Sequence, residues 1–130
     1  MGCRWLFTPK FNPDRSINKY KARLVAKGYT QTYGIDYQET FAPIAKFNTI
    51  QVLLSIAANL DWSLHQLDVK NAFLNGDLEE EVYMEVPNGI HARNNSVCKL
   101  NKSLYGLKQS LKAWFSKFSR VVKKLNYTQE

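Results

Sequence analysis

The stretch HQLDVKNAFLNGDLEEEVYMEVP, residues 65–87, decides the fold because it joins two segments in which apolar and polar side chains alternate. The first segment, SLHQLDV at 63–69, has the two-residue period of a β-strand and ends near Asp68. A carboxylate in a packed core is costly unless it is hydrogen-bonded, protonated or bound to a cation. The spacing alone leaves two interpretations of Asp68 open: a cap for the turn DVKNAF, or a functional ligand.

Length and composition limit the class of protein. The chain has 130 residues, 45% of them apolar, which is enough for one domain or a piece of a larger one. Its longest apolar stretch, at 52–60, is shorter than the roughly 20 residues of a membrane-spanning helix, and the N-terminus lacks the pattern of a signal peptide. We expect an intracellular protein, not secreted and without a membrane partner. Cys3 and Cys98 have no metal-ligand spacing, and we interpret them as buried packing residues.

The net charge of +7 is unevenly distributed. Residues 1–31 carry seven Lys or Arg against one acid, and residues 99–124 carry eight and no acid. An acidic cluster lies between them: Asp77, Glu79, Glu80, Glu81 and Glu85. The two basic regions are either solvated faces or a surface that binds phosphates, and charge alone does not decide between these.

The first half of the chain predicts a hairpin, a loop and a helix. Residues 3–11 and 17–26 alternate around the turn NPDRS, which predicts a β-hairpin. Residues 27–43 have no sustained period and predict a long loop. Asn48 and Gln51 have the spacing of a capping box, and a helical apolar stripe follows. The members of that stripe are Ile50, Leu53, Leu54, Ala57 and Leu60.

The second half predicts two more strands, at 81–87 and 96–100, and a helix that begins near Gln109 or Ser110. The apolar stripe of that helix, which we expect to be core, comprises Trp114, Phe118, Val121, Val122 and Leu125. The order of elements predicts an α+β fold in which the helices pack on one face of an antiparallel sheet.

Three long stretches carry a resemblance to a known family. QLDVKNAFLNGDLEEEVYMEVP resembles motif A of the reverse transcriptases of copia-type (pseudovirus-like LTR) retrotransposons. Residues 20–58 are similar to the family's fingers region, and KLNKSLYGLKQSLKAW is similar to its motif B. The resemblance implies part of a right-hand polymerase: fingers over about residues 1–60, and a partial palm through motif B over about 61–130.

The resemblance also implies a metal site. Asp68 matches the first catalytic aspartate of the palm, which with a later pair of aspartates holds two Mg²⁺, and Val69 matches a residue whose carbonyl faces the second metal. Hard cations prefer such oxygen ligands, and two of them about 4 Å apart activate the primer 3′-hydroxyl and stabilise the leaving pyrophosphate.

Three further residues are implied to bind the incoming nucleotide. Phe73 matches the steric gate that leaves no room for a 2′-hydroxyl, although ordinary core packing is the alternative. Arg23 matches the fingers arginine that holds the phosphates, which its planar, bidentate guanidinium suits. Lys10 lies where the family places a triphosphate-binding lysine, and Lys19 or Lys21 are alternatives because hairpin length varies.

Motif B implies contacts to the base pair and to the template. Tyr105 and Gly106 match residues that pack on the pair formed by template and nucleotide, and glycine permits close backbone approach. Gln109 and Ser110 match the start of a helix that approaches the template strand. The alternative is that this segment is only a loop and a helix cap.

The sequence departs from the family pattern in two places. QSLKAW replaces the usual Q-S-P-R-A-W, so a leucine stands where proline would favour helix entry. No Y-x-D-D motif occurs before Glu130, so two of the three metal carboxylates are absent and the Asp68 strand lacks its usual partner. We expect the chain by itself to bind Mg²⁺ weakly and to polymerise nothing.

For the complete enzyme, the resemblance implies an RNA or DNA template-primer, dNTPs and the remainder of a Pol polyprotein as partners, in a cytoplasmic particle or the nucleus. Two alternatives stay open for this chain: a non-catalytic nucleic-acid-binding module that uses the basic segments, or a functionless remnant of such an element.

Overall fold

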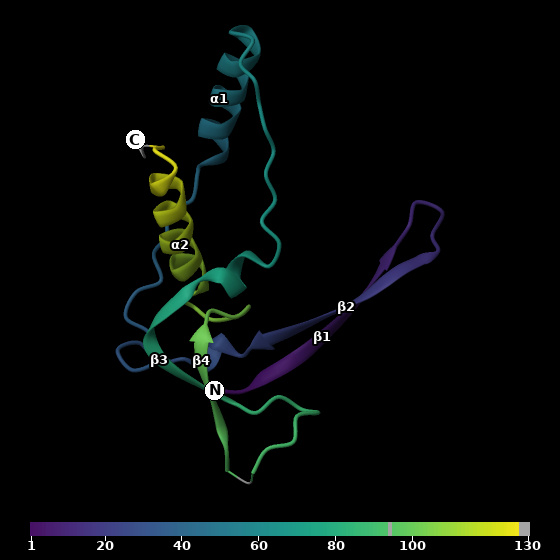
Figure 1. Ribbon diagram of the computed structural model, residues 1–130, viewed down its shortest axis with the longest axis vertical. Coiled ribbons are helices and arrows are strands. Elements are labelled where there is room, and N and C mark those ends of the chain that lie inside the picture. Colours follow the sequence, from purple (N-terminus) through teal and green to yellow (C-terminus); the bar gives the residue numbers. More distant parts are fainter. Residues whose placement is uncertain (94, 128–130) are drawn as a thin grey trace.

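The computed structural model describes residues 1–93 and 95–127, which form two hairpins and two helices. In chain order the elements are β1 (Cys3–Phe11), β2 (Ile17–Ala26), the 3-10 turn η1 (Gly28–Thr30), α1 (Phe47–Asn59), the 3-10 turn η2 (Ala72–Asn75), β3 (Asp77–Glu85), β4 (Val97–Lys102) and α2 (Ser110–Lys124). The predicted α+β class is confirmed at this level. The strands form two separate antiparallel pairs, β1 with β2 and β3 with β4 (Figure 1).

The β1–β2 hairpin forms as predicted, and its turn is held by Asp14. The Asp14 carboxylate accepts hydrogen bonds from the Ser16 hydroxyl at 2.6 Å and the Ser16 backbone N–H at 2.9 Å. These bonds lower the pKa of Asp14 below its ordinary value. Arg15 completes the turn in the left-handed region, with φ of 67°.

The two faces of this hairpin differ sharply in chemistry. Directly paired residues of antiparallel strands share a face, so the strand register assigns each side chain to a face. The pairs Trp5–Leu24, Phe7–Ala22 and Pro9–Tyr20 belong to an apolar face. The pairs Leu6–Arg23, Thr8–Lys21 and Lys10–Lys19 belong to the opposite face, which we call the basic face and which also carries Arg4.

A small core forms where the base of this hairpin meets the second one. Val82 and Met84 of β3 are buried against Ala26 at the end of β2 and against Leu107. Residues 1 and 2 join the two sheets, because the Met1 carbonyl accepts from the Glu85 N–H at 2.8 Å and the Gly2 carbonyl accepts from the Lys27 N–H at 2.9 Å. The hairpin is thereby anchored at one end while its turn projects away (Figure 1).

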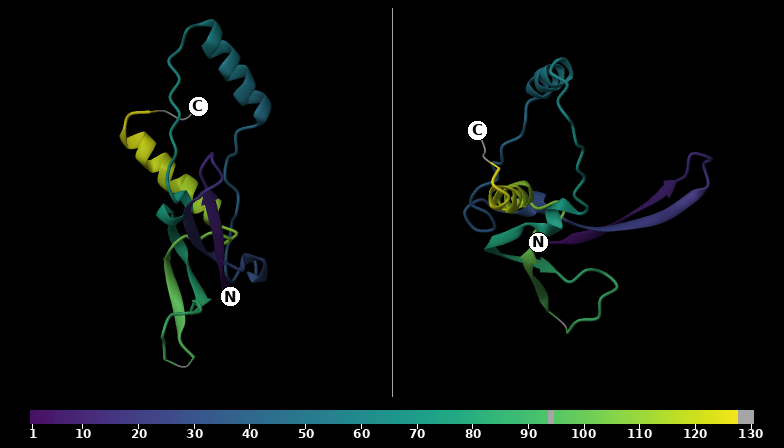
Figure 2. Two further views of the ribbon diagram at one scale, coloured as in Figure 1. Left: turned by 90° about the vertical axis from the view of Figure 1, so that its right-hand side faces the viewer. Right: turned by 45° about the horizontal axis from the view of Figure 1, so that its top comes forward.

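The helices do not cover one face of a sheet, so that part of the predicted architecture is wrong. Helix α2 starts where expected and packs against η2 and β3. Helix α1 stands apart from both hairpins in every view (Figures 1 and 2). Of its predicted stripe only Ala57 is buried, at 2% exposure. The stripe of α2 is not a core either: Trp114 and Val122 are half-buried, and Phe118, Val121 and Leu125 are exposed.

Two local predictions are also wrong. Residues 63–69 form no strand, because a strand needs a neighbour for its backbone groups and none lies beside this segment among the described residues. The capping box is misplaced, since α1 begins at Phe47 with Lys46 as its N-cap and no side-chain cap. The helix ends at Asn59 with Leu60 as its C-cap, and the left-handed φ of 50° at Asp61 then turns the chain.

The cysteines lie at the junction of the hairpins. Cys3 packs against the core, and both Cys3 and Cys98 are free and half-buried, less enclosed than predicted. Burial raises the pKa of the Cys3 thiol, and the nearby Glu85 carboxylate acts in the same direction. Neither of the helices in the described ranges has the length and apolar character needed to cross a membrane.

Candidate functional site

The turn after residue 69 and the loop before α2 bring two predicted site residues together. Phe73 lies on η2, and Tyr105 lies in the loop that follows β4. Their rings meet edge to face, with centroids 5.3 Å apart and an interplanar angle of 77°. Both side chains are half-buried, so each ring keeps an exposed part that a ligand could contact.

The Tyr105–Gly106 segment is joined to the base of the β1–β2 hairpin. The Ala26 N–H donates to the Tyr105 carbonyl at 2.8 Å, which extends β2 by one parallel bridge between Val25 and Tyr105. Gly106 has φ of +91°, and a Cβ there would lie 2.2 Å from the Ala26 carbonyl oxygen. Only glycine fits such an approach to β2, and the expected approach of Gly106 to a base pair stays a prediction.

The basic residues predicted to hold phosphates lie at different distances from this junction. Arg23 is two residues before Val25 on the basic face and is half-buried. A pocket of about 250 Å³ opens beside Gly106 and is lined by Arg4 and Lys27 among others. Two cationic side chains, Arg4 and Lys27, therefore lie beside Gly106.

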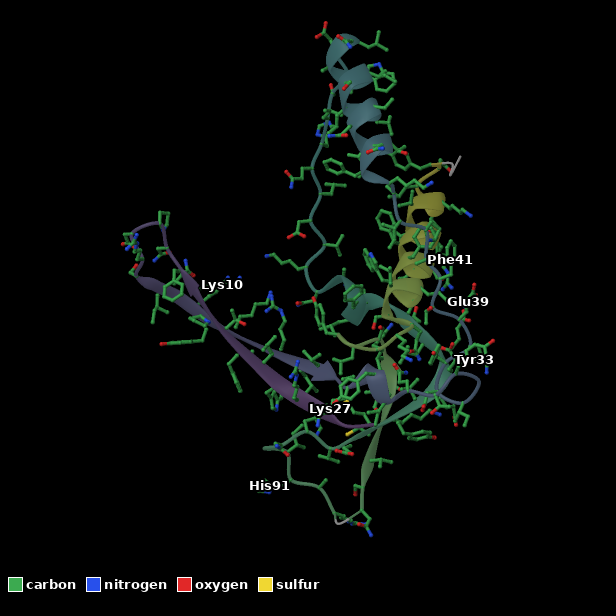
Figure 3. The ribbon with its side chains drawn as sticks, turned by 180° about the vertical axis from the view of Figure 1, so that it is seen from behind. Lys10, Lys27, Tyr33, Glu39, Phe41 and His91 are labelled. Atoms are coloured by element: carbon green, nitrogen blue, oxygen red, sulfur yellow. The ribbon has the colours of Figure 1, made fainter. Side chains whose placement is uncertain are left out.

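Lys10 lies far from this group. It pairs with Lys19, six residues before Val25, and a strand rises about 3.3 Å per residue, so Lys10 is about 20 Å along the hairpin from the Tyr105 bridge. Figure 3 shows Lys10 in the projecting part of the hairpin and Lys27 at its base. Of the alternatives, Lys21 is nearer to the junction than Lys19. The structure does not bring Lys10 together with Phe73 and Tyr105.

Gln109 and Ser110 are buried at the start of α2, with exposures of 2% and 4%. The Gln109 amide accepts from Gln31 Nε2 at 3.0 Å and donates to the Asp36 carbonyl at 3.1 Å. The Ser110 hydroxyl donates to the Leu104 carbonyl at 2.6 Å. Both side chains therefore bind this chain's own backbone and loops, and template contact by them stays a prediction.

Asp68 and Val69 lie in the irregular segment between α1 and η2. Both are exposed, and the Asp68 carboxylate makes no hydrogen bond or ion pair within residues 1–93 and 95–127. It does not cap the following turn, which closes through the Leu74 N–H and the Asn71 carbonyl at 2.9 Å. No group of three His, Cys, Asp or Glu that could hold a metal occurs among the described residues.

The two basic regions differ in how their charges are used. In the C-terminal region, four lysines form ion pairs: Lys99 with Glu81, Lys102 and Lys117 with Asp77, and Lys112 with Glu39 at 3.0 Å. On the basic face of the β1–β2 hairpin, by contrast, no Lys or Arg forms an ion pair with a described residue. The acidic cluster and Glu39 together thus neutralise half of the C-terminal lysines and arginines and leave the hairpin strongly positive.

Asp77 links three elements through its carboxylate. Lys102 of β4 and Lys117 of α2 both donate to it, the latter at 2.8 Å. The hydrogen bond from Lys102, with that from Lys117, lowers the pKa of Asp77 to about 2. In the same sheet, the bond from Lys99 lowers the pKa of Glu81 and raises that of Lys99.

Comparison with known proteins decides the family. The family described as "Reverse transcriptase (RNA-dependent DNA polymerase)" matches residues 1–130, the whole chain. The chain belongs to this reverse transcriptase family. No solved structure matches it.

Similar proteins include long transposon polyproteins from plants. The reverse transcriptase chain is 55% identical over 117 residues to the "Retrovirus-related Pol polyprotein from transposon RE1" of Arabidopsis thaliana and 54% identical to that from transposon RE2, with 88% of this chain covered in each case. It is 51% identical over 127 residues, 96% of the chain, to the Pol polyprotein from transposon TNT 1-94 of Nicotiana tabacum. The chain spans only 8–10% of the length of these relatives.

Sequence reasoning missed three residues that shape this reverse transcriptase segment. Gln31 sits in an aperiodic loop and gave no signal, although it is buried and bonded to Gln109. Gly28 was visible only as one of two loop glycines, yet a Cβ on it would lie 1.9 Å from the Gly106 carbonyl oxygen. Asp77 was counted in the acidic cluster, but its two lysine partners come from elements that only the fold brings near.

Proposed function

We propose that this chain is the fingers region, about residues 1–60, and the first part of the palm, about residues 61–130, of an RNA-directed DNA polymerase from a copia-type retrotransposon. The observation that carries the proposal is the contact between Phe73 and Tyr105. Two residues assigned to nucleotide binding from separate motifs meet here, 5.3 Å apart, at the base of a hairpin with a free basic face.

In this proposal the incoming nucleotide binds where the Phe73–Tyr105 pair meets the base of the β1–β2 hairpin. The Phe73 ring excludes a 2′-hydroxyl and selects deoxynucleotides by shape. Tyr105 supplies a flat apolar surface for the new base pair, and Gly106 lets the backbone approach it. Arg23 binds the phosphates, since a guanidinium donates two parallel hydrogen bonds to such oxygens. Lys10 acts farther out, toward the turn of the hairpin.

Magnesium fits only part of the site that these residues offer. Asp68 would supply a carboxylate oxygen and Val69 a carbonyl oxygen, both of the kind that Mg²⁺ prefers. Two oxygens do not make a site for two cations, so we assign the remaining carboxylates to a part of the parent polyprotein beyond this sequence. When bound, the metals would activate the primer hydroxyl and stabilise the departing pyrophosphate.

The partners of the complete enzyme would be an RNA or DNA template-primer, dNTPs and the remaining regions of the Pol polyprotein. The parent element would work in a cytoplasmic particle or in the nucleus. In this chain we assign the start of α2, with Gln109 and Ser110, to the side that approaches the template.

A second candidate function is nucleic-acid binding without catalysis. The basic face of the hairpin favours it, because lysines and arginines that form no ion pair with the described part of the chain are free to bind phosphates. It predicts binding of a primer-template that weakens steeply with salt and is independent of Mg²⁺.

Primer extension with this chain tests the polymerase proposal in its present form. With primer-template, dNTPs and Mg²⁺, the proposal predicts that the wild-type chain binds the duplex but adds no nucleotide. Incorporation above background that disappears in Asp68→Ala would show that the chain holds a complete metal site and would refute the assignment of the missing carboxylates. Failure to bind primer-template at low salt would refute both candidate functions.

A further inference from the structure

Gln31 forms a buried polar link between the loop after β2 and the start of α2. Its side chain is 5% exposed, its Nε2 donates to Gln109 Oε1 at 3.0 Å, and its Oε1 accepts from the Lys108 backbone N–H at 2.9 Å. Both ends of the carboxamide are therefore used. Gln109 is itself 2% exposed, and its own Nε2 donates to the Asp36 carbonyl at 3.1 Å.

Other contacts hold the same loop against α2. The Lys108 ammonium donates to the Gln31 carbonyl at 3.4 Å and to the Tyr37 hydroxyl at 3.2 Å, and it lies 4.8 Å from the centroid of the Tyr37 ring. Glu39 pairs with Lys112 of α2 at 3.0 Å. In Figure 3, Tyr33, Glu39 and Phe41 follow one another upward in the region of α2. The loop is thus fastened along the first turns of the helix.

This link borders the segment that carries Tyr105 and Gly106. Gly28 and Gly106 touch so closely that a Cβ on Gly28 would meet the Gly106 carbonyl at 1.9 Å. Gln31 lies one helical turn beyond Gly28, and its N–H donates to the Gly28 carbonyl at 3.1 Å. The Gln31 side chain therefore binds Lys108 and Gln109, which follow Gly106 in the chain, while the turn that carries Gln31 contacts Gly106 through Gly28.

A buried carboxamide with both ends satisfied has one low-energy arrangement, because any shift of either segment leaves a donor or an acceptor without a partner. A contact made only of apolar side chains would allow the loop after β2 to slide along the start of α2. We propose that Gln31 is a positioning residue, which sets the place of the Tyr105–Gly106 segment relative to the hairpin and so determines how that segment meets the base pair at the primer end. This inference rests on the proposed polymerase function.

The experiment measures two signals on one primer-template. A fluorescein at the far end of the duplex reports overall binding by anisotropy, and a 2-aminopurine opposite the next nucleotide position reports the local environment of the primer end. The variants are Gln31→Met, which keeps the volume and removes the polar groups, and Gln31→Glu, which keeps the acceptor for the Lys108 N–H. Gln38→Met is the matched control, since Gln38 lies in the same loop and is exposed.

We expect overall binding within about twofold of wild type in all three variants, because the basic face of the hairpin is intact. In Gln31→Met the 2-aminopurine response should fall by more than half, and hydrogen exchange of the Lys108 N–H should accelerate at least about tenfold while β1–β2 amides keep their protection. Gln31→Glu should fall between Gln31→Met and wild type, and Gln38→Met should match wild type. A merely structural role would instead accelerate exchange throughout and lower both signals together.

A 2-aminopurine response equal to wild type in folded Gln31→Met overturns the inference and leaves the polymerase proposal standing. If Gln31→Met loses the protection of the β1–β2 amides, the test uses the 2-aminopurine response of Gln31→Glu instead. A response of Gln31→Glu equal to wild type then overturns the inference. Absence of binding, or of any 2-aminopurine response, in the wild-type chain overturns the polymerase proposal and this inference with it.

Discussion

The ring of Phe73 stands edge-on to the ring of Tyr105, with centroids 5.3 Å apart. This contact ties the turn that follows Asp68 to the loop that precedes α2, and the Tyr105 carbonyl in turn accepts the Ala26 N–H at the end of β2. Three separate parts of the chain therefore meet at one aromatic pair. We propose that this aromatic pair is both a structural joint and part of a nucleotide-binding surface.

The aromatic pair should be measurable as a coupling energy. Phe73→Ala should lower the free energy of unfolding by about 1–2 kcal/mol, since the ring is only half-buried. Combined with Tyr105→Ala in a double-mutant cycle, it should show a coupling of about 0.5–1.5 kcal/mol. Urea denaturation measures both values. Phe7→Ala is the control, because Phe7 is 71% exposed and should cost less than about 0.5 kcal/mol. Additive effects at Phe73 and Tyr105 would contradict the contact.

Gly106 offers a test of the close approach to β2. Gly106 and Gly89 both have φ of +91°, but a Cβ at Gly89 meets nothing within 4 Å, whereas at Gly106 it would lie 2.2 Å from the Ala26 oxygen. Gly89→Ala should therefore cost about 1 kcal/mol from backbone strain alone. Gly106→Ala should cost clearly more and should accelerate hydrogen exchange of the Ala26 N–H. Equal costs in the two variants would mean that the segment and β2 are farther apart than described.

The unpaired and the paired lysines should differ in nucleic-acid binding. Changing Lys10 and Lys19 together to alanine should flatten the log-log dependence of primer-template affinity on salt by up to about two units, one for each lost phosphate contact. Changing Lys99 and Lys102 together should leave that slope unchanged, because acidic side chains already bind these lysines. Both double variants lose the same charge. The opposite ranking of the two slopes would place the phosphate-binding surface on the C-terminal region.

Asp77 should make the free energy of unfolding depend on pH in the acidic range. Its pKa is lowered to about 2 by Lys102 and Lys117, while an unfolded aspartate titrates near pH 3.9. The ion pairs therefore stabilise the fold fully above about pH 4, and this contribution disappears as the pH falls toward about 2. Asp77→Asn should lower stability at pH 7 by a modest amount, since the group is exposed, and should flatten the curve between pH 4 and 2. Asp61→Asn, at a carboxylate outside the described ion pairs, serves as control; a curve for Asp77→Asn that matches wild type would rule out this network.

The hairpin and α2 could be predicted because their patterns are local. Strand alternation on both sides of NPDRS and three- and four-residue spacing around Trp114 need no knowledge of the rest of the chain. The segment at 63–69 has an equally clear alternation but forms no strand. Alternation shows which side chains would share a face, and it cannot show whether a second strand lies beside them to accept the backbone hydrogen bonds.

Residues of the candidate site could be predicted from the sequence where a family motif indicated them. Contacts between segments that are distant in the sequence could not be predicted, because they depend on the tertiary structure. Phe73, Tyr105 and Gly106 came from resemblance, and the structure brings them together. Gln31 carried no signal, because one polar residue in an aperiodic loop looks the same whether it is solvated or buried. The pairing of Lys99 and Lys102 with acids was likewise invisible, since it depends on the register of β3 with β4.

The most direct test rebuilds this segment into a complete polymerase and compares Phe73→Ala with Asp68→Asn. The measurement is kcat/KM for a matched dNTP and rNTP pair in each variant. We expect Phe73→Ala to raise ribonucleotide use and to retain much of the deoxynucleotide rate, because the ring acts by exclusion. We expect Asp68→Asn to lower the rate for both sugars by orders of magnitude, because a group that stabilises the transition state is lost. An unchanged dNTP to rNTP ratio in Phe73→Ala would contradict the placement of motif A on this chain.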